Sequence, residues 1–336
     1  MRYMVYFLYV LFLVSACSGQ TKGEDFPAKT MTASASSVKI KRFDKDLYKY
    51  LSEPTPANEK MLSSSYKAFL PAFGRITINN SDSFKKEFYV RLQRYFSNTM
   101  LNEIYENSLA AFSDITEYEK ELSIADAMIY DNFNGRRLPA LYMHVSGFKE
   151  NVMVLDGIIS LSIDKYLGED YKYYKDFFEP YQLIQMRPQT VTRDYIRAWL
   201  LSENIVNKEN KQTLLSEMIR EGKILYILSR LLPSQPKEDL IGYSSEQMDW
   251  CSENEKKIWT HIVGENHLYD NNYLLIQKYI NEAPYTSTLT PESPGRVGCW
   301  VGWRIVNSYM DANRISLSEL SALDSQTLLK NSGYNP

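Results

Sequence analysis

Two arginines are the first residues in this sequence whose spacing could support chemistry. Arg193 and Arg197 are four residues apart in TVTRDYIRAWLLSENIV, a largely apolar segment with the pattern of a helix over residues 190–206. At about 100° per residue both arginines lie in one narrow sector opposite the apolar face. This sector either faces solvent, which is the ordinary arrangement for paired arginines, or lines a cleft.

Glu221 occupies a position where the helical pattern calls for an apolar side chain. The apolar stripe of KQTLLSEMIREGKILYILSRLLP continues on both sides of it at spacings of three and four residues. A carboxylate in such a stripe must be paired, hydrogen-bonded, metal-bound or protonated, because burial of an isolated charge costs several kcal/mol. Glu221 is therefore either a structural ion-pair residue or part of a ligand cleft. We predict that it pairs with Arg193, Arg197 or both.

Histidine spacing limits the metal chemistry of the chain. The three histidines are His144, His261 and His267, and no two of them are four residues apart, so no helix presents the imidazole pair of an HExxH zinc site. We expect His144 to be packed or hydrogen-bonded in a strand, and His261 and His267 to share one helix. Neither a GxSxG elbow nor a Gly-rich phosphate loop is present. The sequence therefore predicts no metal and no cofactor.

Composition and charge exclude one class of partner. The 336 residues are 44% hydrophobic, enough for a substantial core. The 38 basic and 41 acidic side chains nearly balance, so the chain lacks the electrostatic footprint of a nucleic-acid-binding protein. The 26 tyrosines could stack on sugars at a surface or serve as ordinary core and rim residues.

The chain opens with MRYMVYFLYVLFLVSAC, which has the features of a secretory signal. Arg2 precedes an apolar run that is too short for a transmembrane helix, and small residues follow. The cysteine after VSA resembles the bacterial lipobox, in which cleavage before the cysteine leads to its lipidation. We expect residues 1–16 to be a lipoprotein signal peptide, Cys17 to carry a lipid such as palmitate, and residues 17–37 to form a flexible tether.

The remaining residues, 38–336, are expected to form a single α+β domain that is mainly helical with a small mixed sheet. VKIKRF and three short segments within residues 137–164 have the alternation of strands. Residues 82–133 are helical in pattern, with Asp114 as a cap for one helix. No fixed-period repeat is present.

Two later helices carry more specific signals. One begins at Ser244, which forms a capping box with Gln247, and extends to about His267. The other is GRVGCWVGWRIVNSYM, where Gly298 and Gly302 share one face and allow another backbone to approach closely. These two helices contain Cys251 and Cys299, respectively. An oxidising compartment would permit a disulfide, but buried free thiols are the expected outcome.

Four segments resemble one known family. They are SIDKYLGEDY (162–171), EMIREGKILYILSRLLP (217–233), IGYSSEQMDWCSENEKKIW (241–259) and SPGRVGCWVGWRIVNSYM (293–310). In order and spacing they resemble the gliding-motility lipoprotein GldB, a family that also shows the lipobox. The resemblance implies a cell-envelope lipoprotein, anchored through Cys17 in a bacterial membrane, on the periplasmic or surface face of the outer membrane, with envelope proteins as partners. No enzymatic activity is established for this family, and relatives that do not glide keep it.

The order of elements is also similar, more distantly, to that of gluzincin-type zinc peptidases. If RDYIR overlies HExxH, Arg193 and Arg197 stand at the histidine positions, Asp194 at the catalytic glutamate and Glu221 at the third ligand. This resemblance implies a degenerate zincin fold without zinc, in which guanidinium groups replace the dication as counter-charge to Glu221. The candidate buried ionic cluster or binding cleft comprises Arg193, Asp194, Arg197, Glu221, Lys223 and Arg296.

Three classes of function follow from these patterns. The first is a non-catalytic envelope lipoprotein of the GldB type that acts in gliding or another envelope process by binding partners. The second is an active zinc-dependent metallopeptidase with an unrecognised ligand set. The third is a surface glycan-binding lipoprotein that uses its tyrosines.

Overall fold

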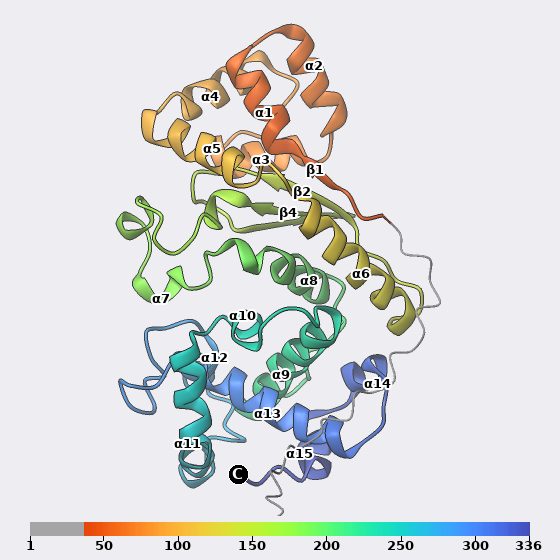
Figure 1. Cartoon of the computed structure of the whole chain (residues 1–336), viewed down its shortest axis with the longest axis vertical. Helices are drawn as coiled ribbons and strands as arrows, with labels where there is room; N and C mark the ends of the chain where they lie inside the picture. The colour runs from red at the N-terminus through yellow and green to blue at the C-terminus, as the bar shows by residue number, and fades with distance from the viewer. Residues whose placement is uncertain (1–36) are drawn as a thin grey trace, which may run out of the picture.

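A four-stranded mixed sheet separates two groups of helices in the computed structural model, which describes residues 37–336 (Figure 1). The strand order is β1-β2-β4-β3, with β2 parallel to both β1 and β4 and with β3 antiparallel to β4 at one edge. These strands confirm the predicted small sheet of an N-terminal strand and three later ones. Their bounds are β1 Ile40–Arg42, β2 Ala140–His144, β3 Val152–Leu155 and β4 Ile158–Ser162.

The predicted signal peptide, its lipidated cysteine and all but the last residue of the predicted tether lie outside the described residues. Within residues 37–336, no helix combines the length and the apolar character needed to cross a membrane.

The first group of helices covers one face of the sheet. Phe69 of α3 packs against both Phe43 of α1 and Tyr142 of β2, with ring centroids 4.9 and 5.3 Å apart. Such edge-to-face aromatic contacts stabilise the layer beyond the area that they bury. The helices of this group are α1 Phe43–Ser52, α2 Pro56–Ser65, α3 Phe69–Ile78, α4 Lys86–Phe96 and α5 Thr99–Ala111.

On the opposite face lies α8 (Val191–Ser202), with α6 (Thr116–Asn132) beside it. The Tyr195 hydroxyl of α8 donates a hydrogen bond of 2.6 Å to the Tyr142 carbonyl of β2, which fixes the helix beneath the sheet. The N-cap residue of α6 is Ile115 and not the predicted Asp114, which lies one residue earlier and accepts a hydrogen bond of 2.9 Å from the Thr116 amide.

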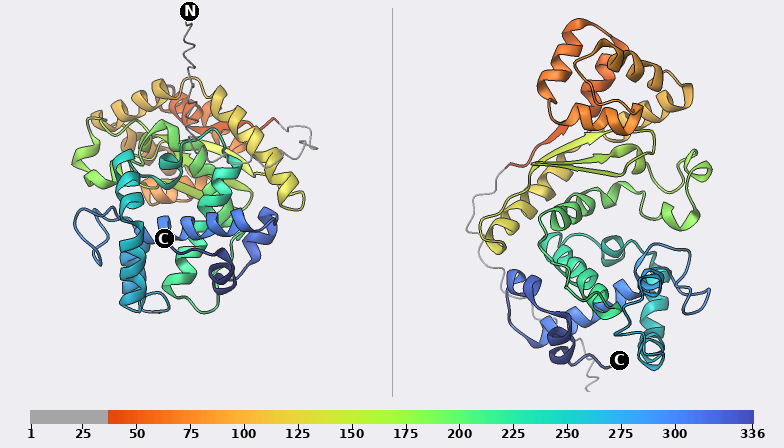
Figure 2. Two further views of the ribbon diagram at one scale, coloured as in Figure 1. Left: turned by 60° about the horizontal axis from the view of Figure 1, so that its bottom comes forward. Right: turned by 180° about the vertical axis from the view of Figure 1, so that it is seen from behind.

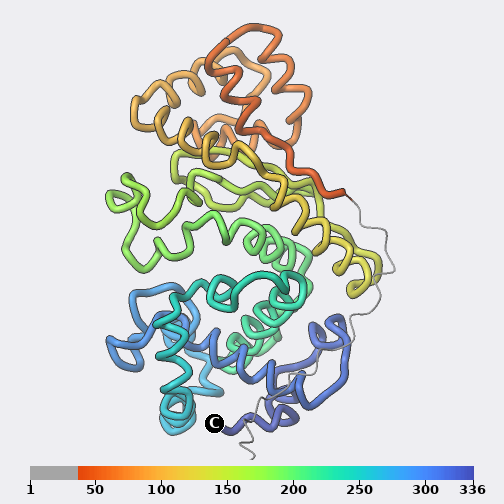
Figure 3. The backbone as a smooth tube through the Cα atoms, in the orientation of Figure 1, coloured from red at the N-terminus to blue at the C-terminus, as the bar shows by residue number. Residues whose placement is uncertain are grey.

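The second group of helices lies beyond α8, and the C-terminus lies at the end of the molecule opposite to α1 and α2 (Figures 2 and 3). At its centre α9 and α13 pack against each other over a longer stretch than any other helix pair. The helices not yet named, most of them in this group, are α7 Pro180–Leu183, α9 Leu214–Leu231, α10 Lys237–Ile241, α11 Ser245–Gly264, α12 Tyr273–Ile280, α13 Val297–Ala312, α14 Leu317–Ala322 and α15 Ser325–Ser332.

Glycines make the crossing of α9 and α13 possible. A Cβ atom on Gly302 would lie 1.8 Å from the Met218 carbonyl oxygen of α9, and one on Gly222 would lie 2.3 Å from the Gly302 carbonyl. On the same face of α13, a Cβ on Gly298 would lie 2.9 Å from the Tyr279 carbonyl. The predicted close backbone approach at Gly298 and Gly302 is thus confirmed.

Two predicted helices end earlier than expected. The helix predicted over 190–206 ends at Ser202, and Asn204 adopts the left-handed conformation with φ 54°. The helix that begins with the confirmed Ser244 capping box ends at Gly264, two residues before Asn266 with φ 58°. A left-handed residue stops helical hydrogen bonding, and asparagine tolerates this conformation better than most residues do.

The early end of α11 corrects the expectation that His261 and His267 share one helix, because His267 lies three residues beyond it. His267 instead contacts the Tyr279 hydroxyl at 3.0 Å. His144 is fully buried and its Nδ1 lies 2.7 Å from the Ser160 hydroxyl, as expected for a hydrogen-bonded strand residue. Cys251 and Cys299 are buried free thiols, also as expected.

Candidate functional site

The unusual carboxylate and one of the two unusual arginines meet between α8 and α9. Arg197 Nη2 lies 2.7 Å from Glu221 Oε2, and Glu221 is only 5% exposed. The predicted pairing of Glu221 with the arginine pair is therefore confirmed for Arg197. The basic sector of α8 does not face bulk water, since the Arg197 side chain is 26% exposed and Arg193 is buried.

Two further guanidinium groups act on Glu221. Arg220 Nη1 lies 3.4 Å from Glu221 Oε1. Arg296, just before α13, attracts the same carboxylate electrostatically. Burial alone would raise the pKa of Glu221, but Arg197, Arg296 and Arg220 together outweigh it and hold this pKa below its ordinary value. Glu221 is consequently ionised at neutral pH although it lies in an apolar stripe.

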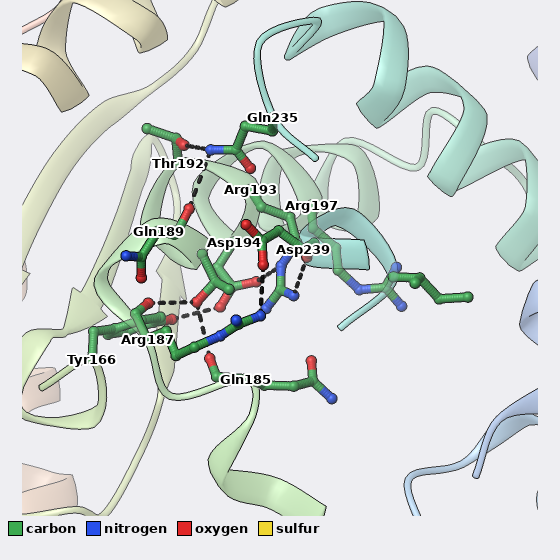
Figure 4. Close-up of polar contacts among 12 residues, drawn as sticks. Tyr166, Gln185, Arg187, Gln189, Thr192, Arg193, Asp194, Arg197, Gln235 and Asp239 are labelled. Atoms are coloured by element: carbon green, nitrogen blue, oxygen red, sulfur yellow. Dashed lines mark hydrogen bonds and ion pairs between the residues drawn. The ribbon is translucent and has the colours of Figure 1, made fainter. Parts of the chain in front are cut away.

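Arg193 belongs to a separate network (Figure 4). Its Nε lies 2.7 Å from Asp194 Oδ1, and its Nη1 donates to the Asp239 carbonyl at 2.8 Å. Asp194 also accepts a hydrogen bond of 2.7 Å from the Tyr166 hydroxyl, and Arg187 pairs with Asp239 Oδ1 at 2.5 Å. Two arginines and two carboxylates balance in this network, and the ion pair of Arg193 is with Asp194 and not with Glu221.

Lys223 lies outside both networks, contrary to its place in the predicted cluster. Its ammonium group donates to the Leu323 carbonyl, just beyond the end of α14, and lies 3.5 Å from the Ser321 carbonyl. The reason is helical geometry, because a residue two positions after Glu221 is rotated by about 200° from it. Burial lowers the pKa of Lys223 to about 8.

A cavity of about 750 Å³ joins the two networks below α8. Its walls come from the edge strand β3, the chain before α8 that includes α7, then α8, α9, α10, the end of α12 and the segment before α13. The volume lies in the range of pockets that enclose small ligands. The charged and amide side chains that line it are Asn151, Lys165, Gln182, Gln185, Arg193, Asp194, Arg197, Glu221, Asn281, Glu282 and Arg296.

Arg296, which also lines the cavity, has an unusual backbone conformation. Its φ is 61°, in the left-handed region that non-glycine residues rarely adopt. Its Nη1 donates a hydrogen bond of 2.9 Å to the Ile241 carbonyl of α10. In the described part of the chain no ion pair joins Arg296 to a carboxylate.

Several members of the networks were not predicted from the sequence. Arg220 stands next to Glu221 in the chain, and that adjacency was the available signal. Tyr166, Arg187 and Asp239 had no such signal, because each has an ordinary local pattern and Tyr166 and Asp239 are distant in sequence from Arg193. Their roles depend on how the segment before α8 and helix α10 fold against Arg193 and Asp194.

The residues of this site do not fit zinc. A guanidinium group has no lone pair for a metal, so neither Arg193 nor Arg197 could serve as a ligand. The carboxylates Asp194 and Glu221 are both held by arginines. Among residues 37–336 no three histidine, cysteine or acidic side chains are grouped so that they could hold a metal ion.

The fold and the cavity define a mainly helical α+β protein whose cleft is walled by arginines, carboxylates and amides. The sequence matches the family described as Gliding motility protein GldB over residues 26–336. The protein therefore belongs to the GldB family, as its four segments predicted, and this membership supports a gliding-motility-related function in the cell envelope. Comparisons with curated proteins and with solved structures gave no match. The similarity to gluzincins stays a prediction.

Proposed function

We propose that this GldB protein is a lipid-anchored envelope protein that binds a partner in the cavity below α8 without hydrolysing it. The observation that carries the proposal is the charged wall, where Arg197, Glu221 and Arg296 come from three separate segments and are held by contacts within the protein. Side chains that are already ordered lose little entropy when a ligand arrives, so this arrangement favours binding.

The absence of hydrolysis is proposed from the chemistry of the wall. Arg193 and Arg197 stand where the resemblance to gluzincins would put the two histidine ligands. Their charges repel a metal dication, and without the metal no water is activated in the way a zinc peptidase requires. Purified protein incubated with a peptide pool, with and without added Zn²⁺, is expected to leave the peptides intact. Zinc-dependent cleavage that disappears in Glu221→Gln would replace this proposal with the metallopeptidase alternative.

The glycan-binding alternative depends on an exposed aromatic platform. Many tyrosines instead lie in the core, where desolvated rings are unable to stack on a sugar. Tyrosines among the largest fully buried side chains are Tyr50, Tyr105, Tyr166, Tyr174, Tyr195 and Tyr279.

The anchor is proposed to be the lipid on Cys17. A Cys17→Ser protein is expected to lose incorporation of labelled palmitate and to keep its uncleaved signal segment, seen as a higher apparent mass, because serine offers no thiol for the lipid and the lipoprotein signal peptidase cuts only before a lipidated cysteine. Cys251→Ala, which alters a buried thiol, serves as the control and should keep both the palmitate incorporation and the mature mass. Unchanged palmitate incorporation and an unchanged mature mass of Cys17→Ser would contradict the proposed anchor.

Binding in the cavity is tested by photo-crosslinking in intact cells. A photoreactive residue at Leu201, which lines the cavity and is 40% exposed, is expected to capture an envelope component that mass spectrometry identifies. The matched control is Phe84, which is 83% exposed between α3 and α4 on the far side of the sheet. Equal capture at both positions, or capture at Phe84 alone, would overturn the proposal that the cavity is the binding site.

A further inference from the structure

We infer that the cavity recognises a single carboxylate group, which Arg197 and Arg296 hold between them and which is the end of a peptide-like chain. The inference rests on the proposed binding function and names the chemical group that this function would recognise. It follows from the charges of the wall, from the free donors of two arginines, and from the other side chains around them.

The first observation is the surplus of positive charge around Glu221. Arg197, Arg220 and Arg296 act on this one carboxylate, and Arg296 has no ion pair of its own in the described residues. Glu217 lies close enough to attract Arg220 and offsets part of that charge, but it does not line the cavity. On the cavity side, Arg197 and Arg296 therefore both act on Glu221, and Glu282 offsets part of the charge of Arg296.

Four basic and three acidic side chains line the cavity, so the wall has a small net positive charge. Asp194 pairs with Arg193, and Glu282 accepts a hydrogen bond of 2.7 Å from Gln185 but keeps its negative charge, which attracts Arg296. The fourth basic group is Lys165 on the far wall, whose ammonium group donates to a backbone carbonyl at 3.2 Å. An acidic ligand group would thus meet net positive charge inside a partly desolvated space, where charge pairs are stronger than in water.

The second observation is the number of donors that remain. A guanidinium group has five N–H donors. Arg197 uses Nη2 for Glu221, and Arg296 uses Nη1 for the Ile241 carbonyl and also hydrogen-bonds to the Cys299 thiol. Both side chains line the cavity, and the donors that these contacts leave are available to an incoming oxyanion. Arginine forks match the planar, two-oxygen geometry of a carboxylate.

The third observation is the backbone at Arg296. The left-handed conformation is unfavourable for a non-glycine residue and persists only where the surrounding structure stabilises it. Here the neighbouring Gly295 lies so close to α12's trailing segment that a Cβ would stand 2.2 Å from the Ala283 carbonyl. Arg296 directly follows this tight passage and lines the cavity with its backbone in the left-handed conformation.

The wall also selects the kind of anion. Glu221 and Glu282 would repel a phosphate dianion, whereas a monoanion matches the small net charge of the wall. The amides of Asn151, Gln182 and Asn281 line the same space, and a carboxamide offers both a donor and an acceptor to a peptide group. A carboxylate at the end of a peptide-like chain satisfies both requirements.

The test measures binding of an N-acetylated tetrapeptide pool with free carboxyl termini to the purified lipoprotein in detergent. The same pool with amidated termini is the matched probe, and acetate and inorganic phosphate are the minimal anions. The variants are Arg197→Gln, Glu221→Gln and Arg304→Gln, the last being a control on α13 whose arginine pairs with Glu255 on the surface. Circular dichroism of each variant checks that it is folded.

We expect the carboxylate pool to bind and the amidated pool to bind at least about tenfold more weakly, since a charged hydrogen-bonded pair is lost. Arg197→Gln should weaken carboxylate binding by a similar factor and Arg304→Gln should not change it. Glu221→Gln should tighten it, because the internal competitor for Arg197 loses its charge; a merely structural Glu221 would not produce this gain.

Equal binding of the two pools, binding of neither at millimolar concentration, or tighter binding of phosphate than of acetate would overturn the inference. None of these outcomes decides whether a partner binds in the cavity, which the photo-crosslinking at Leu201 tests separately. Capture of an envelope component at Leu201, together with indifference to the carboxylate, would retain binding in the cavity and reject its chemical specificity.

Discussion

Replacement of Gly302 by alanine is expected to destabilise the protein by about 2–3 kcal/mol through the crossing of α9 and α13. The new methyl would stand 1.8 Å from the Met218 carbonyl oxygen and 2.4 Å from its carbon. Because both obstacles are backbone atoms, no rotamer change relieves the clash and the helices must separate by about 1 Å or more. Overpacking of this kind costs up to about 3 kcal/mol, and the higher helix propensity of alanine returns less than about 1 kcal/mol.

Urea unfolding of the purified protein, followed by circular dichroism, measures this effect as a lower midpoint with an unchanged m-value. Gly264→Ala is the matched control, since a Cβ there has no neighbour within 4 Å. It should unfold at the same or a slightly higher urea concentration because it gains only helix propensity. An unfolding midpoint for Gly302→Ala at or above that of the wild type would refute the argument from backbone contact.

Three further predictions concern the buried polar groups. Glu221→Ala should lower the stability at pH 7 by about 3 kcal/mol, because it leaves the facing guanidinium groups uncompensated. This difference in stability should shrink in acid, since the pKa of Glu221 is lowered in the folded state and the contribution of its charge is lost as pH falls through that pKa. Lys223 has a folded pKa of about 8 against 10.5 in the unfolded chain, so the folded state releases its proton first. Urea titrations at several pH values should therefore show the stability of the wild type rising relative to Lys223→Met from about pH 8 to pH 10.5, by roughly 3 kcal/mol at most; a constant difference would contradict the assigned burial. Cys251 and Cys299 should react with a thiol reagent only after unfolding, since both are buried and burial raises the pKa of Cys299 to about 11; rapid reaction of the native protein would show that the thiols are accessible.

Sequence patterns predicted the sheet and most helices because these elements depend on short-range regularities. Alternation within residues 137–164 indicated strands, and the Ser244 capping box located the start of α11. Helix ends were less well predicted, since Asn204 and Asn266 stop their helices by local left-handed conformations that periodicity does not reveal. For the same reason the sequence placed His267 on a helix that ends three residues earlier.

The sequence by itself determined that Glu221 had to find a counter-charge and that α8 carried a basic pair, because helical periodicity assigns each residue to a face. It also determined the family, through the order of four segments. Only the tertiary structure decided that Arg197 meets Glu221 while Arg193 binds Asp194. That choice depends on how α8 and α9 are rotated against each other, which is set by packing between residues far apart in the chain.

The same distinction explains the remainder of the site. Lys223 and Glu221 are two residues apart but point to different sides of α9, so proximity in sequence did not make them neighbours. Arg296 and Glu221 are distant in sequence, yet close passage of α9 past α13 at Gly222 and Gly302 brings them to one cavity. Local patterns establish which charges are costly to bury, and the crossing of helices establishes which opposite charges can offset that cost.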